Sequence, residues 1–319
     1  MQPPHPTTRR HTLTLLASSL LLPRHQTRAD EVIAPKVCDI HQHTHYHGRT
    51  DEHLISHQRA MGIHRSILLP AGTPMQTAST HDGKSNGLAA QCGTTAEAQR
   101  LAAEHPDLFL WGVNDVTDAP EAPKVIETYL KQGACIIGEQ KFDVACDSAA
   151  SQRLYAMAAD YGVPILLHFQ NEMYNRGYET FHRMLEKYPR TTFIGHAQAV
   201  WGYIDANHDR TQNYPKGPVT RGGLTDRYLT DYANMFADLS AGSGLNALMR
   251  DEEHTRGFLT RHQDKLLYGS DCKDHFGRGP GCQGAQTLAA IRQLAPDPAA
   301  IEKILWKNAA RLFPLEAKA

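Results

Sequence analysis

Two histidines separated by one residue, His41 and His43, are the side chains whose spacing most directly suggests chemistry. They end the stretch Val37–His43, whose composition is typical of a β-strand. Alternate residues of a strand share a face, so both imidazoles should point the same way. Such a pair alone is weak evidence of a metal site, because surface strands carry it by chance.

Three more candidate ligands end apolar stretches later in the chain: His168 after residues 163–167, His196 after residues 193–195, and Asp271 after residues 268–270. Individually, His168 could be a core histidine and Asp271 a turn cap. Together, several imidazoles and one carboxylate suit Zn²⁺, and also Mn²⁺ or Fe²⁺. The five residues therefore predict one divalent metal ion, with zinc the first choice.

The elements that must position these residues alternate regularly. The expected strands are Val37–His43, Arg65–Leu69, Phe109–Val113, Cys135–Lys141, Pro164–His168, Thr192–His196, Met235–Leu239 and Leu266–Asp271. The clearest helical patterns are Thr94–His105, Ala122–Lys131, Ala149–Tyr161, Tyr178–Tyr188 and Asp251–Arg261. Strands that alternate with helices form parallel sheets, and eight such units predict a closed (β/α)₈ TIM barrel.

Two polar stretches interrupt the pattern, Met75–Cys92 after the second strand and Gly202–Gly223 after the sixth. Loops of this length in a compact domain usually cover or bind ligands. Both would lie at the carboxyl-end mouth of the barrel, where active sites of this fold are built.

The sequence resembles the amidohydrolase superfamily, specifically its family 2 branch, the aminocarboxymuconate-semialdehyde decarboxylase-like metal-dependent hydrolases. The resemblance covers residues 36–315 and rests on Asp39–His43, Gly138–Lys141, Leu167-His168, Gly195-His196, Tyr268–Asp271 and Ile301–Leu315. It implies a metal held by His41, His43, His168 and Asp271. It also implies that His196 positions the metal's water or polarises the substrate.

This ligand set predicts a hydrolase that attacks the carbonyl of a small amide, lactone or ester. Asp271 would take a proton from the activated water and pass it to the leaving group, while His196 would bind the water or the developing oxyanion. A non-oxidative decarboxylase or hydratase of a small carboxylic acid is the alternative on the same scaffold. A binding protein built on a decayed barrel is disfavoured, because all five expected positions are filled.

Three further residues are candidates for a second metal site or for contacts with the substrate. Glu139 and Lys141 are two residues apart, so both could face the barrel interior, and one of them could bind a second metal, the glutamate directly or the lysine after carbamylation. An internal ion pair or an anchor for an anionic substrate would explain them equally well, and we favour a single metal. Trp201, five residues after His196, is a candidate wall of the substrate site.

Composition limits the partners. The net charge is −1, with 33 basic and 34 acidic residues, and no basic stripe favours nucleic acid. Arg9-Arg10 before the apolar run Leu13–Leu22 predicts a twin-arginine export signal over residues 1–29, followed by one barrel domain over 30–319. The run is too short to span a membrane stably. We therefore expect an exported enzyme with a small-molecule substrate; a homo-oligomer stays open.

Export would allow a disulfide, and Cys272 with Cys282 is the pair that one loop region could join. Buried free thiols are the other interpretation. None of the six cysteines forms the paired C-x-x-C pattern of a zinc framework.

Overall fold

Eight short strands, all parallel, form the centre of the part of the chain that the structure describes. This computed structural model describes Met1 and residues 35–71 and 92–316. The strands are Cys38–Gln42 (β1), Arg65–Leu68 (β2), Phe109–Trp111 (β3), Ile137–Gln140 (β4), Ile165–His168 (β5), Phe193–His196 (β6), Met235–Asp238 (β7) and Leu266–Leu267 (β8).

The strands follow one another around a ring in chain order. Regular ladders join β1 to β3 and β4 to β8. The two ladders meet at a parallel bridge between Val113 and Ile137. On the other side, the Ile40 N–H donates to the Tyr268 carbonyl oxygen over 3.1 Å. Backbone hydrogen bonds therefore run around the whole ring, and the predicted eight-stranded barrel is confirmed.

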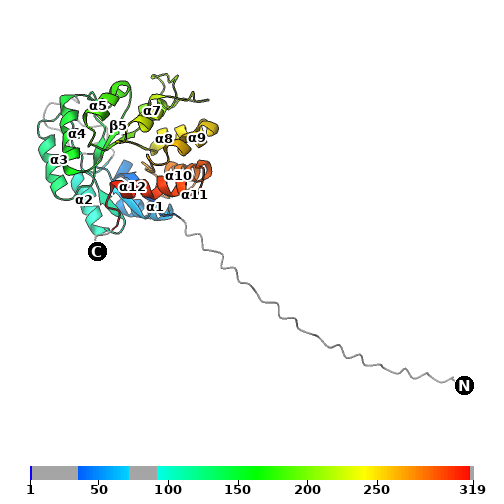
Figure 1. The fold of residues 1–319 in the computed structure, drawn as a ribbon. Coiled ribbons are helices and arrows are strands. Elements are labelled where there is room, and N and C mark those ends of the chain that lie inside the picture. The colour runs from blue at the N-terminus through cyan, green and yellow to red at the C-terminus, as the bar shows by residue number, and fades with distance from the viewer. Residues whose placement is uncertain (2–34, 72–91, 317–319) are drawn as a thin grey trace, which may run out of the picture. The chain divides into compact units, whose positions relative to one another are not determined.

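Helices lie around the outside of the strands (Figure 1). They are Asp51–Ala60 (α1), Thr95–Glu104 (α2), Ala122–Lys131 (α3), Ala149–Tyr161 (α4), His182–Lys187 (α5), Gln198–Gly202 (α6), Leu224–Asp231 (α7), Ala241–Met249 (α8), Glu252–His262 (α9), Gln283–Leu294 (α10), Pro298–Glu302 (α11) and Asn308–Leu312 (α12). Two 3₁₀ turns, Tyr46–Gly48 (η1) and Tyr178–Thr180 (η2), and a π-helical turn, Lys303–Lys307 (η3), complete the described elements.

Local sequence signals set several helix ends. The Ser148 hydroxyl accepts a hydrogen bond from the Ser151 N–H and caps α4, which ends at Gly162 in the left-handed conformation (φ 64°). The predicted helix Tyr178–Tyr188 is instead η2 followed by α5. The Phe181 N–H bonds the Tyr178 carbonyl, three residues back, which tightens the turn between them.

Strand β8 is shorter than predicted and ends at Leu267 instead of Asp271. Asp271 has a φ of 41°, a left-handed conformation that no regular strand contains. Its N–H still donates to the His41 carbonyl oxygen over 2.8 Å. Asp271 therefore stays beside β1 although the ladder has ended.

The alternation of side chains along β5 separates two apolar layers. Ile165 and Leu167 belong to the layer between the strands and the surrounding helices. Leu166 belongs to a second cluster with Ile194 and Leu267 from neighbouring strands, and Phe313 joins it from beyond α12. His168 shares the inward face with Leu166, because they are two residues apart. The barrel interior is thus apolar below and polar above, at the carboxyl ends of the strands.

The predicted loop Gly202–Gly223 contains no helix or strand after Tyr203, so this described segment is a long loop between α6 and α7. The predicted loop Met75–Cys92 lies outside the described residues except for Cys92. The predicted export signal over residues 1–29 also lies outside them after Met1. Among the described helices, none is both long and apolar enough to cross a membrane.

Candidate metal centre

The structure brings together the five residues that the sequence singled out. The Nε2 atoms of His41 and His43 are 3.2 Å apart at the end of β1. His43 Nε2 lies 3.4 Å from Asp271 Oδ1, and His196 Nε2 lies 3.8 Å from Asp271 Oδ2. Residues far apart in the chain therefore meet at one point inside the mouth of the barrel.

Glu139, at the end of β4, joins these residues at the centre of the cluster. Its Oε2 lies 3.3 Å from His41 Nε2 and 3.6 Å from His43 Nε2. Its Oε1 lies 2.5 Å from His168 Nδ1 and 3.7 Å from His196 Nε2. The two oxygens thus face two different pairs of histidines, which is the arrangement of a carboxylate that can serve two metal ions.

Contacts behind the imidazoles fix which nitrogen faces the cluster. His41 Nδ1 lies 2.7 Å from Asp238 Oδ2, and His43 Nδ1 lies 2.6 Å from the Leu69 carbonyl oxygen. His196 Nδ1 lies 3.2 Å from the same Asp238 oxygen. Because these oxygens accept hydrogen bonds from Nδ1, Nε2 is the nitrogen that each imidazole turns toward the site. Nε2, once deprotonated, is the atom that binds a metal.

Asp238 and Ser240 are functional residues that the sequence reasoning missed. The Ser240 hydroxyl donates to Asp238 Oδ2 over 2.7 Å and lies 3.1 Å from His196 Nδ1. Asp238 ends the observed strand β7, one residue before the predicted end at Leu239, so a polar residue near a strand end was the signal that could have found it. Gly269 permits the close approach behind them, because a Cβ there would lie 2.6 Å from Asp238 Oδ1 and 2.8 Å from His41 Cβ.

Burial and neighbouring charges together set the protonation states of Asp271, Glu139 and His168. Burial of Asp271 favours its neutral form, but the charge of His41 and then the neighbouring His43 lower the pKa of Asp271 to about 2. Burial likewise opposes ionisation of Glu139, but a hydrogen bond from His168 and the neighbouring His41 hold its pKa well below the usual range. Burial and then the charge of Lys141 lower the pKa of His168 to about 4. Both carboxylates are therefore ionised at neutral pH, and His168 is neutral.

The cluster fits a bound cation for a reason independent of any family resemblance. Glu139 Oε2, His196 Nε2 and Asp271 Oδ1 are buried acceptors without a hydrogen-bond partner among the described residues. Leaving three such acceptors unpaired in the interior costs about 1–3 kcal/mol each. A cation that accepts their lone pairs would remove that cost, and His/Glu/Asp groups here can hold one.

A cavity of about 310 Å³ opens directly above the cluster and is large enough for a small molecule. Asp271, His168 and His196 form its floor, and Tyr46 and Lys141 line its side. Burial opposes the charged form of Lys141, but Glu139 and Asp271 raise its pKa. Lys141 therefore supplies a positive charge to the cavity.

Trp201 does not line this cavity in the described part of the chain, contrary to its prediction as a substrate wall. Helix α6 turns its side chain into the core, where 3% of the residue is exposed. Its Nε1–H donates to the Asp238 carbonyl oxygen over 3.0 Å, and its ring packs against Phe258. Trp201 is therefore close to His196 in sequence but does not border the cavity.

The cluster geometry agrees with a sequence comparison. The family model described as Amidohydrolase (Amidohydro_2) matches residues 38–315. The chain belongs to the amidohydrolase family. Members of this family are metal-dependent enzymes that act on small molecules, as hydrolases or decarboxylases.

Solved structures with a similar fold support the same architecture. An uncharacterized TIM-barrel protein from Bordetella bronchiseptica is 18% identical, with 82% of each chain covered and a TM-score of 0.56. A 2,6-dihydroxybenzoate decarboxylase in complex with 2,6-dihydroxybenzoate is 14% identical, covering 88% of this chain and 99% of its own (TM-score 0.57). A probable 2-pyrone-4,6-dicarboxylic acid hydrolase from Acinetobacter baumannii, with citric acid bound, is 13% identical, covering 87% and 99% (TM-score 0.55). A comparison with curated proteins finds no significant match.

Proposed function

We propose that this protein is a metal-dependent hydrolase that cleaves an amide, lactone or ester bond of a small anionic molecule. The observation that carries the proposal is the convergence of Glu139 Oε2, His196 Nε2 and Asp271 Oδ1, buried and without hydrogen-bond partners among the described residues, beside a cavity that His196 and Asp271 line. Catalytic metal sites need such a set of preorganised ligands beside an open space.

The shared position of Glu139 favours two metal ions over the single ion that the sequence suggested. One would be held by His41, His43 and Glu139, with Asp271 beside them, and the other by Glu139, His168 and His196. Imidazole and carboxylate donors of this kind suit Zn²⁺. When bound, such ions lower the pKa of a coordinated water to about 7 and polarise a carbonyl oxygen.

Asp271 is the residue best placed to move protons. It lies on the cavity floor, and its lowered pKa keeps it ionised and able to accept a proton from the attacking water. It can then return that proton to the leaving group. His196 presents an unprotonated Nε2 to the site, so it acts as a ligand or acceptor; donation of a hydrogen bond to an oxyanion falls instead to Tyr46 or Lys141 on the cavity side.

The cavity side also indicates the charge of the substrate. Lys141 and Lys273 line the cavity together with Tyr46 and Tyr214. Asp271 raises the pKa of Tyr46, with burial adding to the effect, so its hydroxyl stays protonated and available as a donor. An ammonium group and phenol rings around one small cavity suit a carboxylated substrate.

A non-oxidative decarboxylase is the second candidate, because Lys141 could bind the carboxylate that is lost or protonate the carbon that remains. The two reactions separate in one experiment. The purified enzyme is incubated in ¹⁸O-labelled water with lactones, esters, amides and aromatic carboxylates, and products and carbon dioxide are analysed by mass spectrometry. Label in a new carboxylate supports hydrolysis, whereas carbon dioxide without label in the organic product supports decarboxylation.

Metal content tests the two-ion arrangement separately. Glu139→Gln should lower the metal bound per chain by at least one equivalent relative to the wild type, measured by elemental analysis. Asp231→Asn on α7 is the matched control, because it also replaces a carboxylate with an amide but its side chain is exposed. Unchanged metal content in Glu139→Gln would contradict the shared-ligand role.

We further propose that residues 1–29 direct export by the twin-arginine route, with cleavage near Ala29. Support comes from Arg9-Arg10 before the apolar run Leu13–Leu22. Expression in a bacterial host followed by cell fractionation should place the processed protein in the periplasm. Replacing both arginines with lysine should retain it in the cytoplasm; a periplasmic double variant would contradict the route.

A further inference from the structure

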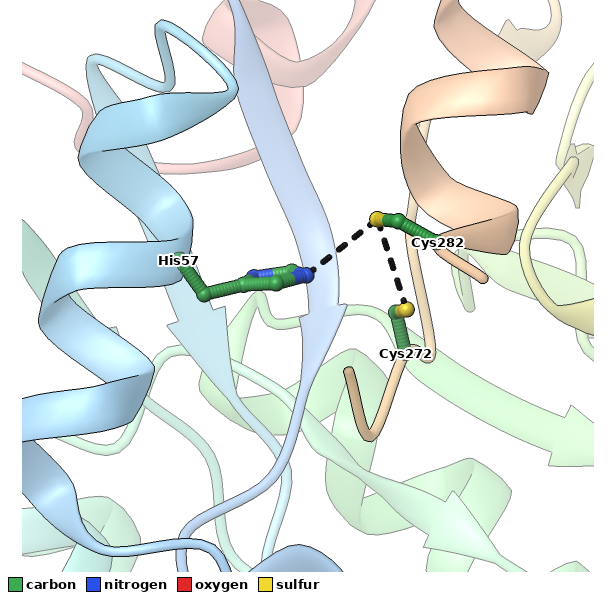
Figure 2. Close-up of side chains that lie close together, drawn as sticks. All are labelled: His57, Cys272 and Cys282. Carbon is green, nitrogen blue, oxygen red and sulfur yellow. Dashed lines mark hydrogen bonds between the residues drawn. The ribbon is translucent and has the colours of Figure 1, made fainter. Parts of the chain in front are cut away.

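A second group of metal-binding side chains lies outside the candidate metal centre. His57 projects from α1, Cys272 follows Asp271 in the loop after β8, and Cys282 lies at the start of α10. Figure 2 shows the three side chains pointing toward one another. Cys282 Sγ lies 3.4 Å from His57 Nε2 and 3.6 Å from Cys272 Sγ. All six cysteines of the chain are free, so the disulfide that the sequence left open is not formed here.

The spacing of these atoms matches that of ligands around one tetrahedral ion. With Zn–S near 2.3 Å and Zn–N near 2.05 Å, tetrahedral geometry separates two sulfurs by about 3.8 Å and a sulfur from a nitrogen by about 3.5 Å. The observed separations of 3.6 and 3.4 Å are within about 0.2 Å of these values. A zinc ion would therefore fit among the three side chains with only small side-chain adjustments.

The three side chains are buried, and Cys272 and Asp274 also border the cavity above the candidate metal centre. His57 and Cys282 have no exposed surface, and Cys272 is 2% exposed. The fourth position has a candidate in Asp274, whose Oδ2 lies 4.0 Å from His57 Nε2. Met61 Sδ lies 3.8 Å from Cys282 Sγ, a thioether that would favour monovalent copper instead. The carboxylate, together with the fixed imidazole and thiols, favours a zinc site of the structural kind.

We propose that His57, Cys272 and Cys282, with Asp274 as the fourth ligand, form a structural zinc site. The ion clamps the loop that carries Asp271 against helix α1. Two other contacts already hold this loop: Gln42 Nε2 and Arg49 Nη1 both donate to the Cys272 carbonyl oxygen, over 3.0 and 2.7 Å. The site is distinct from the candidate metal centre, because Asp271 faces His43 and His196 whereas the adjacent Cys272 faces Cys282.

Cobalt substitution tests this site in the full chain. Metal is removed with a chelator under reducing, anaerobic conditions, and Co²⁺ is then titrated while the near-ultraviolet absorption is recorded. Thiolate bound to Co²⁺ gives an intense charge-transfer band, which imidazole and carboxylate ligands do not give. The wild type should develop this band, and Cys282→Ser should lose it together with one equivalent of Co²⁺ per chain.

Two variants make the assignment specific. Cys146→Ser is the matched control, because Cys146 is a buried free thiol elsewhere in the fold, and it should retain the band. Glu139→Gln should also retain it while losing hydrolysis, so failure of the proposed function and failure of this inference are distinguishable. A band that persists in Cys282→Ser would overturn the proposal and point to Cys92, which interacts with His43.

A measurement on the unmodified protein covers the case in which Cys282→Ser fails to fold. X-ray absorption at the zinc edge of the zinc-loaded wild type should show a sulfur shell at about 2.3 Å. Absence of that shell would overturn the proposal. So would a Cys272–Cys282 disulfide in the protein as purified, or occupation of this site by monovalent copper alone.

Discussion

The two halves of the barrel interior differ in what their residues contribute. In the lower half, Leu166, Ile194 and Leu267 form a dry apolar cluster with normal packing partners. In the upper half, two residues further along the same strands, His168 and His196 surround acceptors that no described side chain satisfies. The lower half stabilises the fold, whereas the upper half contains unpaired buried acceptors that lower the stability of the metal-free protein and are positioned to bind a metal. Residues two apart on a strand share a face, so the same inward face carries apolar side chains in the lower half and polar side chains in the upper half.

The sharpest test of this division is at Asp271. Asp271→Asn removes the group that accepts and returns the proton, so kcat should fall by about 10²- to 10⁴-fold. The unfolding free energy of the metal-free protein should also fall, because the ionised carboxylate that His41 and His43 stabilise in the folded state is lost. Steady-state kinetics and denaturant unfolding measure the two effects. An active variant would show that another residue moves the proton, and Asp231→Asn should be unaffected in both assays.

Leu166→Ala probes the lower half. Removing a fully buried leucine should lower the unfolding free energy by about 2–5 kcal/mol through lost burial and a residual cavity. The folded fraction should retain its kcat and metal content. His168→Ala, two residues along the same face, should lose activity at a smaller cost to the stability of the metal-free protein. Equal stability losses in the two variants would remove the distinction between the halves.

Asp238→Asn sharpens the comparison at the residues behind the metal ligands. The amide has one acceptor oxygen where the carboxylate has two, so it cannot accept from His41 and His196 at one oxygen and from the Ser240 N–H at the other, and the imidazole tautomers are less well fixed. Metal affinity should fall by about 10- to 100-fold. Competition with a chromophoric chelator gives this value, and thermal unfolding of the metal-free variant shows whether the fold is intact. Undiminished affinity would mean that the strand ends alone orient the imidazoles.

The pH dependence of metal binding is the smallest of these effects. Burial alone would lower the pKa of His41. The charges of Asp271 and Asp238 outweigh burial and raise this pKa well above its usual range in the metal-free protein. A raised pKa means that His41 holds a proton at neutral pH, and a metal must displace it. Affinity should therefore increase with pH by about tenfold per unit for each proton displaced. Calorimetry in buffers of different ionisation enthalpy counts the protons, and zero released would contradict this charge state.

Much of this arrangement follows from local patterns in the sequence. The eight strand positions are visible because short apolar stretches recur with helices between them. His41, His168 and Asp271 are visible because they stand at the carboxyl ends of those stretches. Asp238 obeys the same rule but was passed over, because it lies before Leu239 and the predicted strand continued past it.

Other features depend on contacts that no local pattern contains. Trp201 is close to His196 in sequence, yet α6 rotates its ring into the core. His57 is one of several histidines on or near α1, and only the folded chain shows that it meets Cys272 and Cys282 more than two hundred residues later. β8 ends at Leu267, and the left-handed conformation of Asp271 beyond it is not required by its residue type.

The apolar cluster of the lower half also includes Phe313 and Leu315, which follow all eight strands in the chain. During synthesis the other members of this cluster leave the ribosome before these two residues can cover them. The upper half also depends on late residues, because the His41 carbonyl oxygen accepts a hydrogen bond from the N–H of Asp271, which is synthesised much later. The barrel interior and its metal ligands can therefore be completed only after nearly the whole chain has emerged, which makes folding and metal loading late, coupled events.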